Sequence, residues 1–251
     1  MRTMIVIPAY NEARTVERVV QRVRERCPYV VVVDDGSNDG TGEIARGAEA
    51  VIVRHAVNRG LGAALGTGIA AALARGAECI VTMDADGQHD PTDIAAVIAP
   101  IERGEADVVI GSRFCTGDPP PLTPPPSGRG GMRRFSSSRR EGELEGGGGA
   151  PRSRKIANRI ANIVTRVLFG VRCSDTQSGF RAFSASAARA MDLRTNRMEV
   201  SSEILAEAAR LRLRITEVPI RIIYTEYSLS KGQSFGTGVK TAWGLVLRKL
   251  L

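Results

Sequence analysis

Residues 1–115 repeat one pattern: a short apolar run, a few polar residues, then a stretch with apolar residues at helical spacing. The runs are rich in Val and Ile, which predicts buried strands at residues 3–7, 29–33, 50–53, 79–81 and 107–110. The spacing between them predicts amphipathic helices, with apolar stripes at Val16, Val19, Val20 and Val23 and at Ile94, Val97, Ile98 and Ile101. Alternating strands and helices predict a doubly wound α/β fold, with a mostly parallel sheet and helices on both faces.

The alternation stops at Thr116. Residues 118–153 are dense in Pro, Gly, Ser and Arg and have no apolar period, so we expect a mobile or disordered loop. A loop of this length is either a lid or binding loop, or a surface insertion without a role. We interpret residues 1–251 as one domain that contains this insertion.

Regular patterns return after the loop. Apolar stripes predict helices that start at Arg154 and at Val200, and further strands are expected through Phe183 and at residues 215–223. In residues 239–251, Val, Trp and Leu recur at helical spacing among Lys and Arg. Such an amphipathic helix either packs on the domain or lies in a membrane interface.

Composition narrows the classes of partner. Hydrophobic residues make up 43% of the chain and aromatic residues only 4%, so the core must be built from Val, Ile, Leu and Ala. The net charge of +8, carried mostly by Arg, is compatible with nucleic acid, an anionic membrane or a phosphate-bearing substrate. Aromatic residues are not interleaved with the basic ones, so we expect no nucleic-acid partner.

The cysteines and the lengths of the apolar runs indicate the cellular compartment in which the protein is expected. Four widely spaced cysteines form no Cys-x-x-Cys pair, which predicts free thiols in a reducing compartment. With only two histidines, a histidine-rich zinc site is excluded. The chain begins with a strand pattern and has no apolar run near the ~20 residues of a transmembrane helix. We therefore expect a cytoplasmic protein that can still lie on a membrane surface.

Two acidic residues follow the apolar run at residues 79–81. Asp84 and Asp86 come at the expected carboxyl end of that strand, where open α/β sheets bind ligands. Carboxylates this close repel each other unless a cation lies beside them, and oxygen ligands suit Mg²⁺ or Mn²⁺. Gln88 could add a neutral oxygen. The alternative is a polar turn in which Asp90 is the N-cap and Pro91 the first helical residue.

The strand at residues 29–33 also ends in carboxylates, Asp34 and Asp35. A helix with Asn11 as its expected N-cap joins it to the first strand, which makes a βαβ unit. Residues 58–68 are rich in Gly and Ala, so the helix there can pack closely on the sheet and present its N-terminus to a phosphate. The run lacks the sequence of a P-loop and the acidic residue of a dinucleotide site.

Five motifs occur in order at successive expected strand ends: residues 6–12 (VIPAYNE), 32–37 (VVDDGS), 58–60 (NRG), 84–89 (DADGQH) and 111–113 (GSR). Together they resemble the family 2 glycosyltransferases of GT-A fold. Residues 175–181 (DTQSGFR), with Ser230 and Lys231, resemble the polyprenyl-phosphate branch, the dolichol-phosphate mannose synthase-like enzymes. The resemblance covers nearly all of the chain except the low-complexity loop, and the combination is far more specific than any single motif.

The resemblance implies a donor that is a nucleotide-diphosphate hexose of the GDP-mannose or UDP-glucose type. Asp86 and Gln88 would ligate Mg²⁺ or Mn²⁺, and this ion would bridge the diphosphate. Asp35 can accept from a base or ribose, and Tyr10 can cover a ring. The full set of implied donor-binding residues is Pro8, Tyr10, Glu12, Asp35, Asp84, Ala85 and Lys231.

The implied acceptor is a polyprenyl or dolichyl phosphate, to which the hexose is transferred with inversion. Its phosphate would meet Arg113, Arg154 and Asn158, the last standing where the family often has serine; Arg113 could instead meet the donor. An ionised phosphate nucleophile needs no strong general base. Asp86, Arg113 and Asp175 are the expected catalytic residues, and Asp175 either orients the acceptor or sugar, or caps the turn before Phe180.

Such an acceptor implies a membrane partner, and helices at residues 156–168 and 239–251 would dock the protein peripherally on the cytoplasmic face. Two alternatives stay open. One is a glycosyltransferase acting on a soluble or polysaccharide acceptor. The other is a non-catalytic protein that binds sugar nucleotides.

Overall fold

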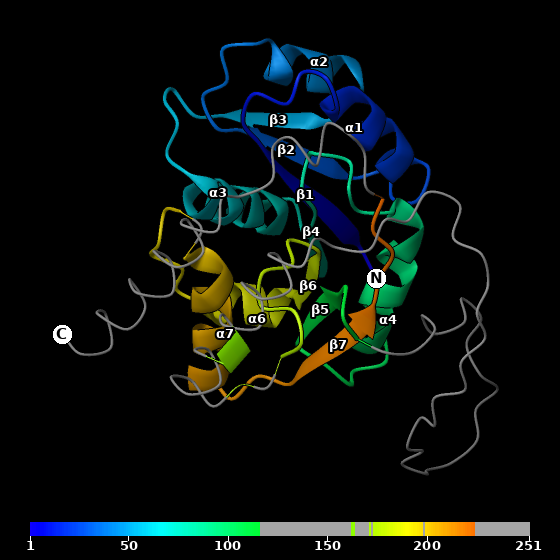
Figure 1. The fold of residues 1–251 in the computed structure, drawn as a ribbon, viewed down its shortest axis with the longest axis vertical. Helices are drawn as coiled ribbons and strands as arrows, with labels where there is room; N and C mark the ends of the chain where they lie inside the picture. Colours follow the sequence, from blue (N-terminus) through cyan, green and yellow to red (C-terminus); the bar gives the residue numbers. More distant parts are fainter. Residues whose placement is uncertain (116–161, 164–170, 172, 198, 224–251) are drawn as a thin grey trace.

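The apolar runs form one seven-stranded sheet in the order β3-β2-β1-β4-β6-β5-β7 (Figure 1). The structure, a computed structural model, describes residues 1–115, 162–163, 171, 173–197 and 199–223. Within the sheet, β6 runs antiparallel to β4 and β5, and the other pairs are parallel. This confirms the predicted α/β class. The strands are β1 (Thr3–Ala9), β2 (Val30–Asp34), β3 (Val51–Arg54), β4 (Cys79–Thr82), β5 (Val108–Ser112), β6 (Arg181–Ser184) and β7 (Ile215–Pro219).

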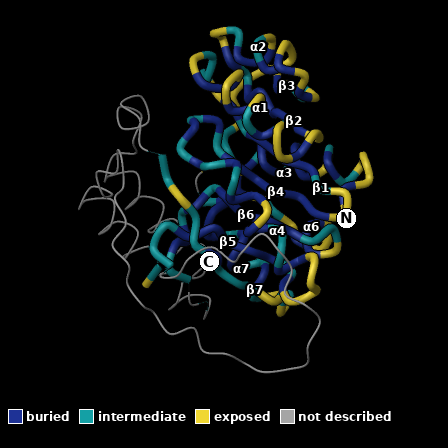
Figure 2. Tube along the Cα trace, turned by 90° about the vertical axis from the view of Figure 1, so that its right-hand side faces the viewer, coloured by how far each residue is buried: buried dark blue, intermediate teal, exposed yellow. Residues whose placement is uncertain are grey.

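Helices cover both faces of the sheet (Figures 1 and 2). The inner strands β1, β2, β4, β5 and β6 are largely buried, whereas the edge strands β3 and β7 are partly exposed. One face packs on α1 (Val16–Arg24), α2 (Thr41–Gly47) and α4 (Ile94–Glu102), and the other on α3 (Leu61–Ala74), α6 (Ala185–Ala190) and α7 (Val200–Arg210). Side chains of β1 alternate, with Ile5 and Ile7 on the first face and Met4 and Val6 on the second. Burial of both faces explains why the strands read as continuous Val and Ile runs.

Glycines bring α3 close to its neighbours. A Cβ on Gly68 would lie 2.2 Å from Val6 Cγ1, and one on Gly62 would lie 1.8 Å from the Thr195 carbonyl oxygen. Both distances are far below van der Waals contact. The helix can therefore reach the sheet and the segment before α7 only with glycine at these positions, which confirms the close packing expected from residues 58–68.

Several predicted boundaries are wrong. Asn11 is not the N-cap of α1; Thr15 holds that position, and the Asn11 side-chain oxygen accepts the Asn38 N–H at 3.0 Å. The strand expected at residues 3–7 continues to Ala9, which still pairs with β2 and whose carbonyl accepts the Asp35 N–H at 2.8 Å. The sequence pattern predicts a strand to residue 223 and a helix from Val200 to Leu213, but β7 ends at Pro219 and α7 at Arg210.

The turn after β4 follows the sequence pattern. A short 3₁₀ turn, Pro91–Asp93, precedes α4, and the Asp90 side chain accepts the Thr92 N–H at 3.0 Å. Asp90 as N-cap and Pro91 as the first helical residue are thus confirmed. The short helix α6 had not been predicted, because its six residues are mostly Ala and Ser and carry no apolar period.

The four cysteines are free thiols, as expected. Burial, with a smaller contribution from the charge of Glu102, raises the pKa of the Cys79 thiol to about 12. It is therefore a protonated core side chain at neutral pH.

Some predictions concern residues outside the described part of the chain. These are the loop at 118–153, Arg154, Asn158, Lys231 and the tail helix at 239–251; of the helix at 156–168, only residues 162–163 are described, and they are helical. Across the described ranges, no helix combines the length and apolar character needed to cross a bilayer.

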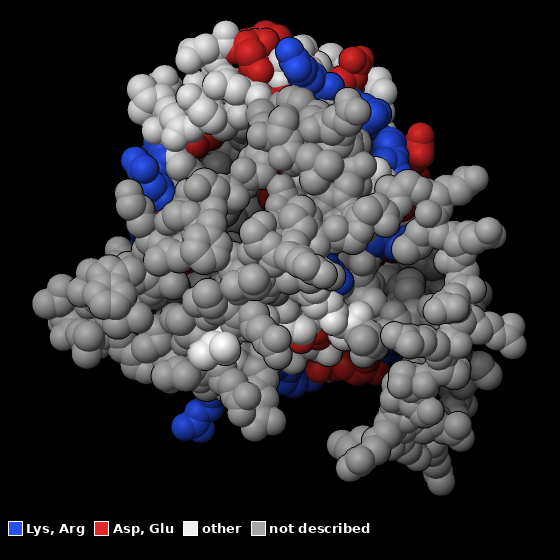
Figure 3. Space-filling model, in the orientation of Figure 1, with Lys and Arg blue, Asp and Glu red and all other residues white. Residues whose placement is uncertain are grey.

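Charges of both signs lie side by side at the end of the domain formed by α1, α2 and β3 (Figure 3). Arg24 pairs with Glu49 at 2.5 Å, and Arg54 with Glu43 at 2.8 Å. Such exposed pairs add little stability, but they balance the charge of this region locally.

The order of the strands indicates where a ligand site is expected. From β1 the chain moves outward to β2 and β3, and then returns to place β4 on the other side of β1. This reversal between β1 and β4 is the topological switch point at which open α/β sheets bind ligands. The carboxyl ends of β1, β2, β4 and β5 and the start of β6 lie along the same edge of the sheet.

Candidate active site at the carboxyl edge of the sheet

The Asp35 carboxylate, at the end of β2, is buried and holds the segment that leads to α3. Its Oδ1 accepts the Arg59 N–H at 2.9 Å and lies 2.6 Å from His55 Nδ1, and its Oδ2 accepts the Gly60 N–H at 2.7 Å. Since a carboxylate only accepts, His55 donates from Nδ1, and its Nε2 lies 3.0 Å from Thr67 Oγ1. Sequence reasoning missed His55, which has no local signature.

The end of β1 lies beside Asp35. Tyr10 is 44% exposed, so its ring is accessible to a ligand, whereas Pro8 is half-buried within β1. The Glu12 N–H donates to Thr41 Oγ1 at 2.9 Å, and the Glu12 carboxylate accepts from the Thr15 hydroxyl at 3.0 Å. The structure thus brings the expected donor-binding residues of β1 and β2 to one place.

Asp84 and Asp86 lie in the turn after β4, with Ala85 buried between them. The Gln88 N–H donates to Asp86 Oδ1 at 2.9 Å, and the Gln88 side-chain amide donates to Asp86 Oδ2. Burial and the neighbouring charge of Asp84 raise the pKa of Asp86. The two carboxylates therefore oppose each other's ionisation, as expected for a pair at a cation site.

The environment of Asp84 favours its charged form. Burial works against ionisation, but the hydrogen bond and charge of His89, with the charges of Arg113 and Arg181, lower the pKa of Asp84 below its usual value. His89 Nε2 lies 3.2 Å from Asp84 Oδ2, and its ring packs 5.2 Å from the Phe180 ring. The sequence pattern gave His89 no role of its own, although it belongs to the same motif.

Gly179, just before β6, makes room for the Asp84 carboxylate. A Cβ at this position would lie 2.4 Å from both Asp84 oxygens. Any larger residue would displace the carboxylate, because heavy atoms do not approach this closely. The contact joins residues 95 positions apart, and it exists because β6 lies beside β4.

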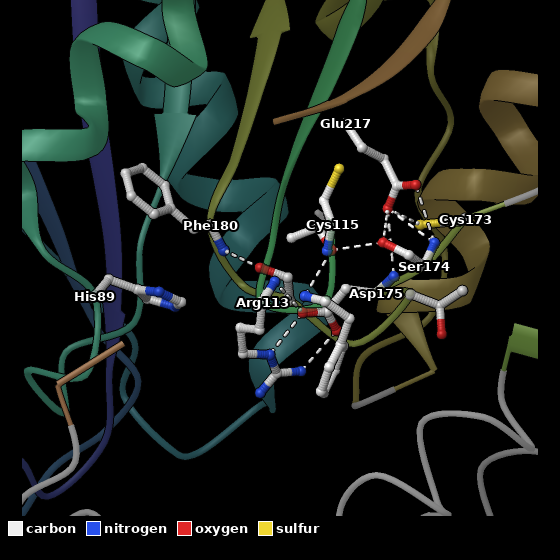
Figure 4. Close-up of polar contacts among 12 residues, drawn as sticks. His89, Arg113, Cys115, Cys173, Ser174, Asp175, Phe180 and Glu217 are labelled. Atoms are coloured by element: carbon white, nitrogen blue, oxygen red, sulfur yellow. Dashed lines mark hydrogen bonds and ion pairs between the residues drawn. The ribbon is translucent and has the colours of Figure 1, made fainter. Parts of the chain in front are cut away.

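Arg113, after β5, is held by Asp175 (Figure 4). Its Nε and Nη2 donate to the two Asp175 oxygens at 2.6 and 2.7 Å, and its backbone N–H donates at 3.1 Å. Asp175 is fully buried and the Arg113 side chain is 22% exposed. The carboxylate of Asp175 is thus directed at Arg113, whose guanidinium is fixed in a bidentate geometry.

Two further residues of this region were missed. Arg181 of β6 is 2% exposed and donates from Nη2 to the Thr176 carbonyl at 2.9 Å; burial lowers the pKa of its guanidinium. Glu217 of β7 accepts the Ser174 N–H at 2.9 and 3.0 Å. The available signal was a charged residue within each strand as the structure has it, at the start of β6 and in the middle of β7.

The donor set after β4 fits a divalent cation that shares its ligands with a substrate. Among the residues that the structure describes, no group of three or more His, Cys, Asp or Glu side chains could hold a metal. Mg²⁺ is often bound by one or two carboxylates, with substrate phosphates and water completing the shell. Asp84 and Asp86 are such a pair. Burial and the charge of Asp84 together raise the pKa of Asp86, and a cation beside the pair would offset both effects.

Comparison with known families gives the class of this site. The family model described as Glycosyl transferase family 2 matches residues 4–164, well over half of the chain. That span includes the ends of β1, β2, β4 and β5 described above. The chain belongs to the family 2 glycosyltransferases and is a glycosyltransferase.

Three relatives can be aligned with nearly the whole chain. An uncharacterized protein of Methanocaldococcus jannaschii is 38% identical, over 98% of this chain and 91% of its own. The UDP-N-acetylglucosamine–dolichyl-phosphate N-acetylglucosaminyltransferase of Methanococcus voltae is 34% identical, over 98% and 95%. The undecaprenyl-phosphate mannosyltransferase of Micrococcus luteus is 34% identical, over 99% and 96%. These relatives confirm the resemblance to the polyprenyl-phosphate branch.

A solved structure with the same fold is glucosyl-3-phosphoglycerate synthase from Mycobacterium tuberculosis in complex with Mn²⁺, UDP and glucosyl-3-phosphoglycerate. The TM-score is 0.68 at 18% identity, over 98% of this chain and 79% of that one. The match confirms the GT-A fold.

Proposed function

We propose that this enzyme transfers a hexose from a nucleotide-diphosphate sugar to a polyprenyl phosphate. The observation that carries the proposal is the meeting, at one sheet edge, of the Asp84–Asp86 pair with Arg113 held by Asp175. Carboxylates that call for a cation suit the diphosphate of a donor, and a fixed guanidinium suits a phosphate. Relatives named for transfer to dolichyl and undecaprenyl phosphate support the same acceptor.

On the donor side, the exposed Tyr10 ring would cover the base or ribose, beside Pro8 and Glu12. Asp35 fixes the 55–60 segment and the start of α3, whose positive N-terminal end would favour the donor phosphates. Asp84 and Ala85 would close on the nucleotide. The sugar donor itself, of the GDP-mannose or UDP-glucose type, is part of the proposal.

Asp86, with Gln88, would hold Mg²⁺ or Mn²⁺. When bound, this ion stabilises the negative charge that develops on the leaving nucleoside diphosphate. For Gln88 to offer its carbonyl oxygen, its side-chain amide must turn away from Asp86, to which it donates in this structure.

The nucleophile would be an oxygen of the lipid phosphate. It forms a bond to the sugar C1, while the bond from C1 to the diphosphate oxygen breaks and its electron pair leaves with the diphosphate. The phosphate is already ionised at neutral pH, so no residue has to remove a proton. Attack opposite the leaving group inverts C1. Arg113, oriented by Asp175, would bind the acceptor phosphate, together with Arg154 and Asn158, and Lys231 would meet the diphosphate.

The acceptor lipid places the reaction at a membrane. We propose peripheral attachment on the cytoplasmic face, through the apolar stripes and basic residues of segments 156–168 and 239–251. Sedimentation with anionic liposomes at low and high salt tests this attachment, and an absence of binding at both salt concentrations contradicts it.

The test of the function is an incubation of the enzyme with GDP- and UDP-sugars, Mg²⁺ or Mn²⁺, and a polyprenyl phosphate, reading labelled lipid. Label in a water-soluble acceptor instead would favour the alternative acceptor. Tight nucleotide binding without transfer to either acceptor would favour a non-catalytic sugar-nucleotide-binding protein.

Asp86 gives the sharpest test of the cation assignment. Asp86→Asn should reduce transfer at least 10²–10³-fold, because charge stabilisation in the transition state is lost. The same change should raise the Tm of the metal-free protein by about 2–4 °C, since it removes like-charge repulsion of about 1 kcal/mol. Mn²⁺ with nucleotide should stabilise the wild type but not the variant. Near-full activity of Asp86→Asn refutes the assignment.

A further inference from the structure

The segment that carries Asp175 is itself anchored from β7. The Glu217 carboxylate accepts the Ser174 N–H through both oxygens, at 2.9 and 3.0 Å, the Ser174 hydroxyl at 2.8 Å and the Asp175 N–H at 3.3 Å (Figure 4). The Cys173 thiol donates to the same carboxylate at 3.2 Å. One side chain thus binds three consecutive residues, 173–175, and the last of them grips Arg113.

We propose that Glu217 is a positioning residue, which holds Arg113 in the orientation that meets a phosphate by fixing the backbone of Ser174 and Asp175. The inference rests on the proposed function for the identity of that phosphate. The contacts themselves do not depend on it.

Glu217 also sets the direction of a chain of hydroxyl groups. A carboxylate only accepts, so the Ser174 hydroxyl donates its proton to Glu217 and must accept from Ser112, 2.6 Å away. Ser112 Oγ in turn accepts the N–H groups of Phe114 and Cys115, at 3.1 and 3.0 Å. The turn that carries Arg113 is therefore fixed from two sides, through Asp175 and through Ser112, and both connections lead to Glu217.

The β-sheet gives this anchor its rigidity. Glu217 lies opposite Ile110 in the parallel pairing of β7 with β5, and Arg113 follows β5 directly. A glutamine at this position would keep the size of the side chain but would offer a single accepting oxygen for the three N–H and O–H groups of Ser174 and Asp175. Its amide would also direct N–H groups at these donors. The 174–175 segment would loosen, and Arg113 would lose its fixed orientation.

The experiment compares Glu217→Gln with the wild type in steady-state transfer to polyprenyl phosphate. We expect KM for the acceptor to rise about 10- to 100-fold while KM for the sugar nucleotide stays within about twofold, because only the phosphate-binding side is displaced. Glu207→Gln is the matched control. Glu207 also accepts a backbone N–H, from Asp192 at 3.1 Å, and lies on α7 outside the site, so both KM values should be unchanged.

A double substitution separates positioning from a general loss of stability. If Glu217 acts through Arg113, Glu217→Gln should have little further effect once Arg113 is replaced. The acceptor KM of the double variant should therefore be less than about twofold higher than that of Arg113→Lys alone. Losses that multiply fully would overturn the inference. Should Glu217→Gln fail to fold, Ser174→Ala serves instead. It removes the hydroxyl connection but keeps the backbone N–H, and should raise acceptor KM in the same direction by a smaller factor.

A readout without substrate keeps the test independent of the proposed function. The signal of the Arg113 Nε–H group in a ¹⁵N NMR spectrum is assigned by its loss in Arg113→Lys. We expect the Nε–H proton to exchange with solvent at least about tenfold faster in Glu217→Gln than in the wild type or Glu207→Gln. Unchanged exchange refutes the positioning role. Faster exchange, in an enzyme that never labels a lipid phosphate, refutes the proposed acceptor and leaves the positioning role intact.

Discussion

Asp35 and Asp175 are two buried carboxylates near the carboxyl edge of the sheet, and they accept hydrogen bonds from different kinds of donor. Asp35 accepts backbone N–H groups from Arg59 and Gly60, with His55 as a further donor. Asp175 instead receives Arg113, whose backbone N–H, Nε and Nη2 donate to it. The first carboxylate fixes the path of the chain, and the second fixes a cationic side chain.

This difference matches the two tasks of a sugar transferase. Backbone donors cannot turn away without moving the fold, so the Asp35 region is a rigid surface against which a nucleotide can pack. A guanidinium stays charged after one carboxylate is bound, so the Asp175 region can present oriented positive charge to a phosphate. Under the proposed function, donor binding would depend on the shape of the Asp35 region and acceptor binding on the oriented charge of Arg113.

The largest effect is expected from Asp175→Asn. The substitution takes the buried carboxylate charge away from Arg113, which should cost about 3 kcal/mol, near the low end of such cases because Arg113 is partly exposed. Unfolding in urea measures the loss. Asp192→Asn, which weakens an exposed pair with Arg194, should cost less than about 0.5 kcal/mol. Equal losses of unfolding free energy in the two variants would show that the ion pair of Asp175 with Arg113 does not stabilise the protein more than an exposed pair does.

Gly179→Ala tests the close contact between Gly179 and the Asp84 carboxylate, which lies between the Asp35 and Asp175 regions. The added Cβ must displace the Asp84 carboxylate, which is 41% exposed and can swing toward solvent, so turnover should fall about 10²-fold with little change in stability. Gly66→Ala is the control: no atom lies within 4 Å of its Cβ, and an alanine in α3 should stabilise by about 0.5–1 kcal/mol. Full turnover in Gly179→Ala would contradict the importance of the Asp84 position.

His55→Phe probes the rigid side. It removes one donor to Asp35 and should cost about 1–2 kcal/mol, with weaker nucleotide binding but little change in acceptor KM. Thr67→Val removes only the outer hydrogen bond of the same histidine, and should leave nucleotide affinity within about twofold. Calorimetric titration with UDP and GDP measures the affinities. If the two variants bind alike, Asp35 does not depend on His55.

Asp90 provides the smallest effect and a pH dependence. Burial would raise its pKa, but the N–H and hydroxyl of Thr92 and the charges of Arg221 and Arg22 lower the pKa below the usual aspartate value. Since the pKa is lower in the folded state, the charged form stabilises the protein above about pH 4, and this contribution is lost as pH falls through the folded-state pKa.

Asp90→Ala should therefore cost about 1 kcal/mol at neutral pH through loss of the cap. Asp90→Asn keeps the cap, and its difference from the wild type should shrink below about pH 4. Thermal unfolding from pH 3 to 7 records both. A difference that grows toward low pH would mean that folding raises the pKa of Asp90 instead of lowering it.

How much of the site could be read from the sequence depends on the distance between partners. Asp84, Asp86 and Gln88 lie within five residues, and the strand pattern before them is enough to predict that they share a turn. The N-cap Asp90 is equally local. Arg113 and Asp175 are 62 residues apart, and neither the residues between them nor any periodicity predicts that they pair. His55 and Glu217 were missed for the same reason.

The sequence by itself determined the α/β class, the order of most elements and the acidic ends of β2 and β4. Burial of a strand or helix gives its apolar residues a characteristic local spacing in the sequence, and the ends of the strands can be located from that spacing. Only the tertiary structure decided which side chains meet. It places β6 antiparallel between β4 and β5, so that Gly179 faces Asp84 and the segment before it reaches Arg113. Strand order is fixed by packing across the whole sheet, and no stretch of the chain encodes it alone.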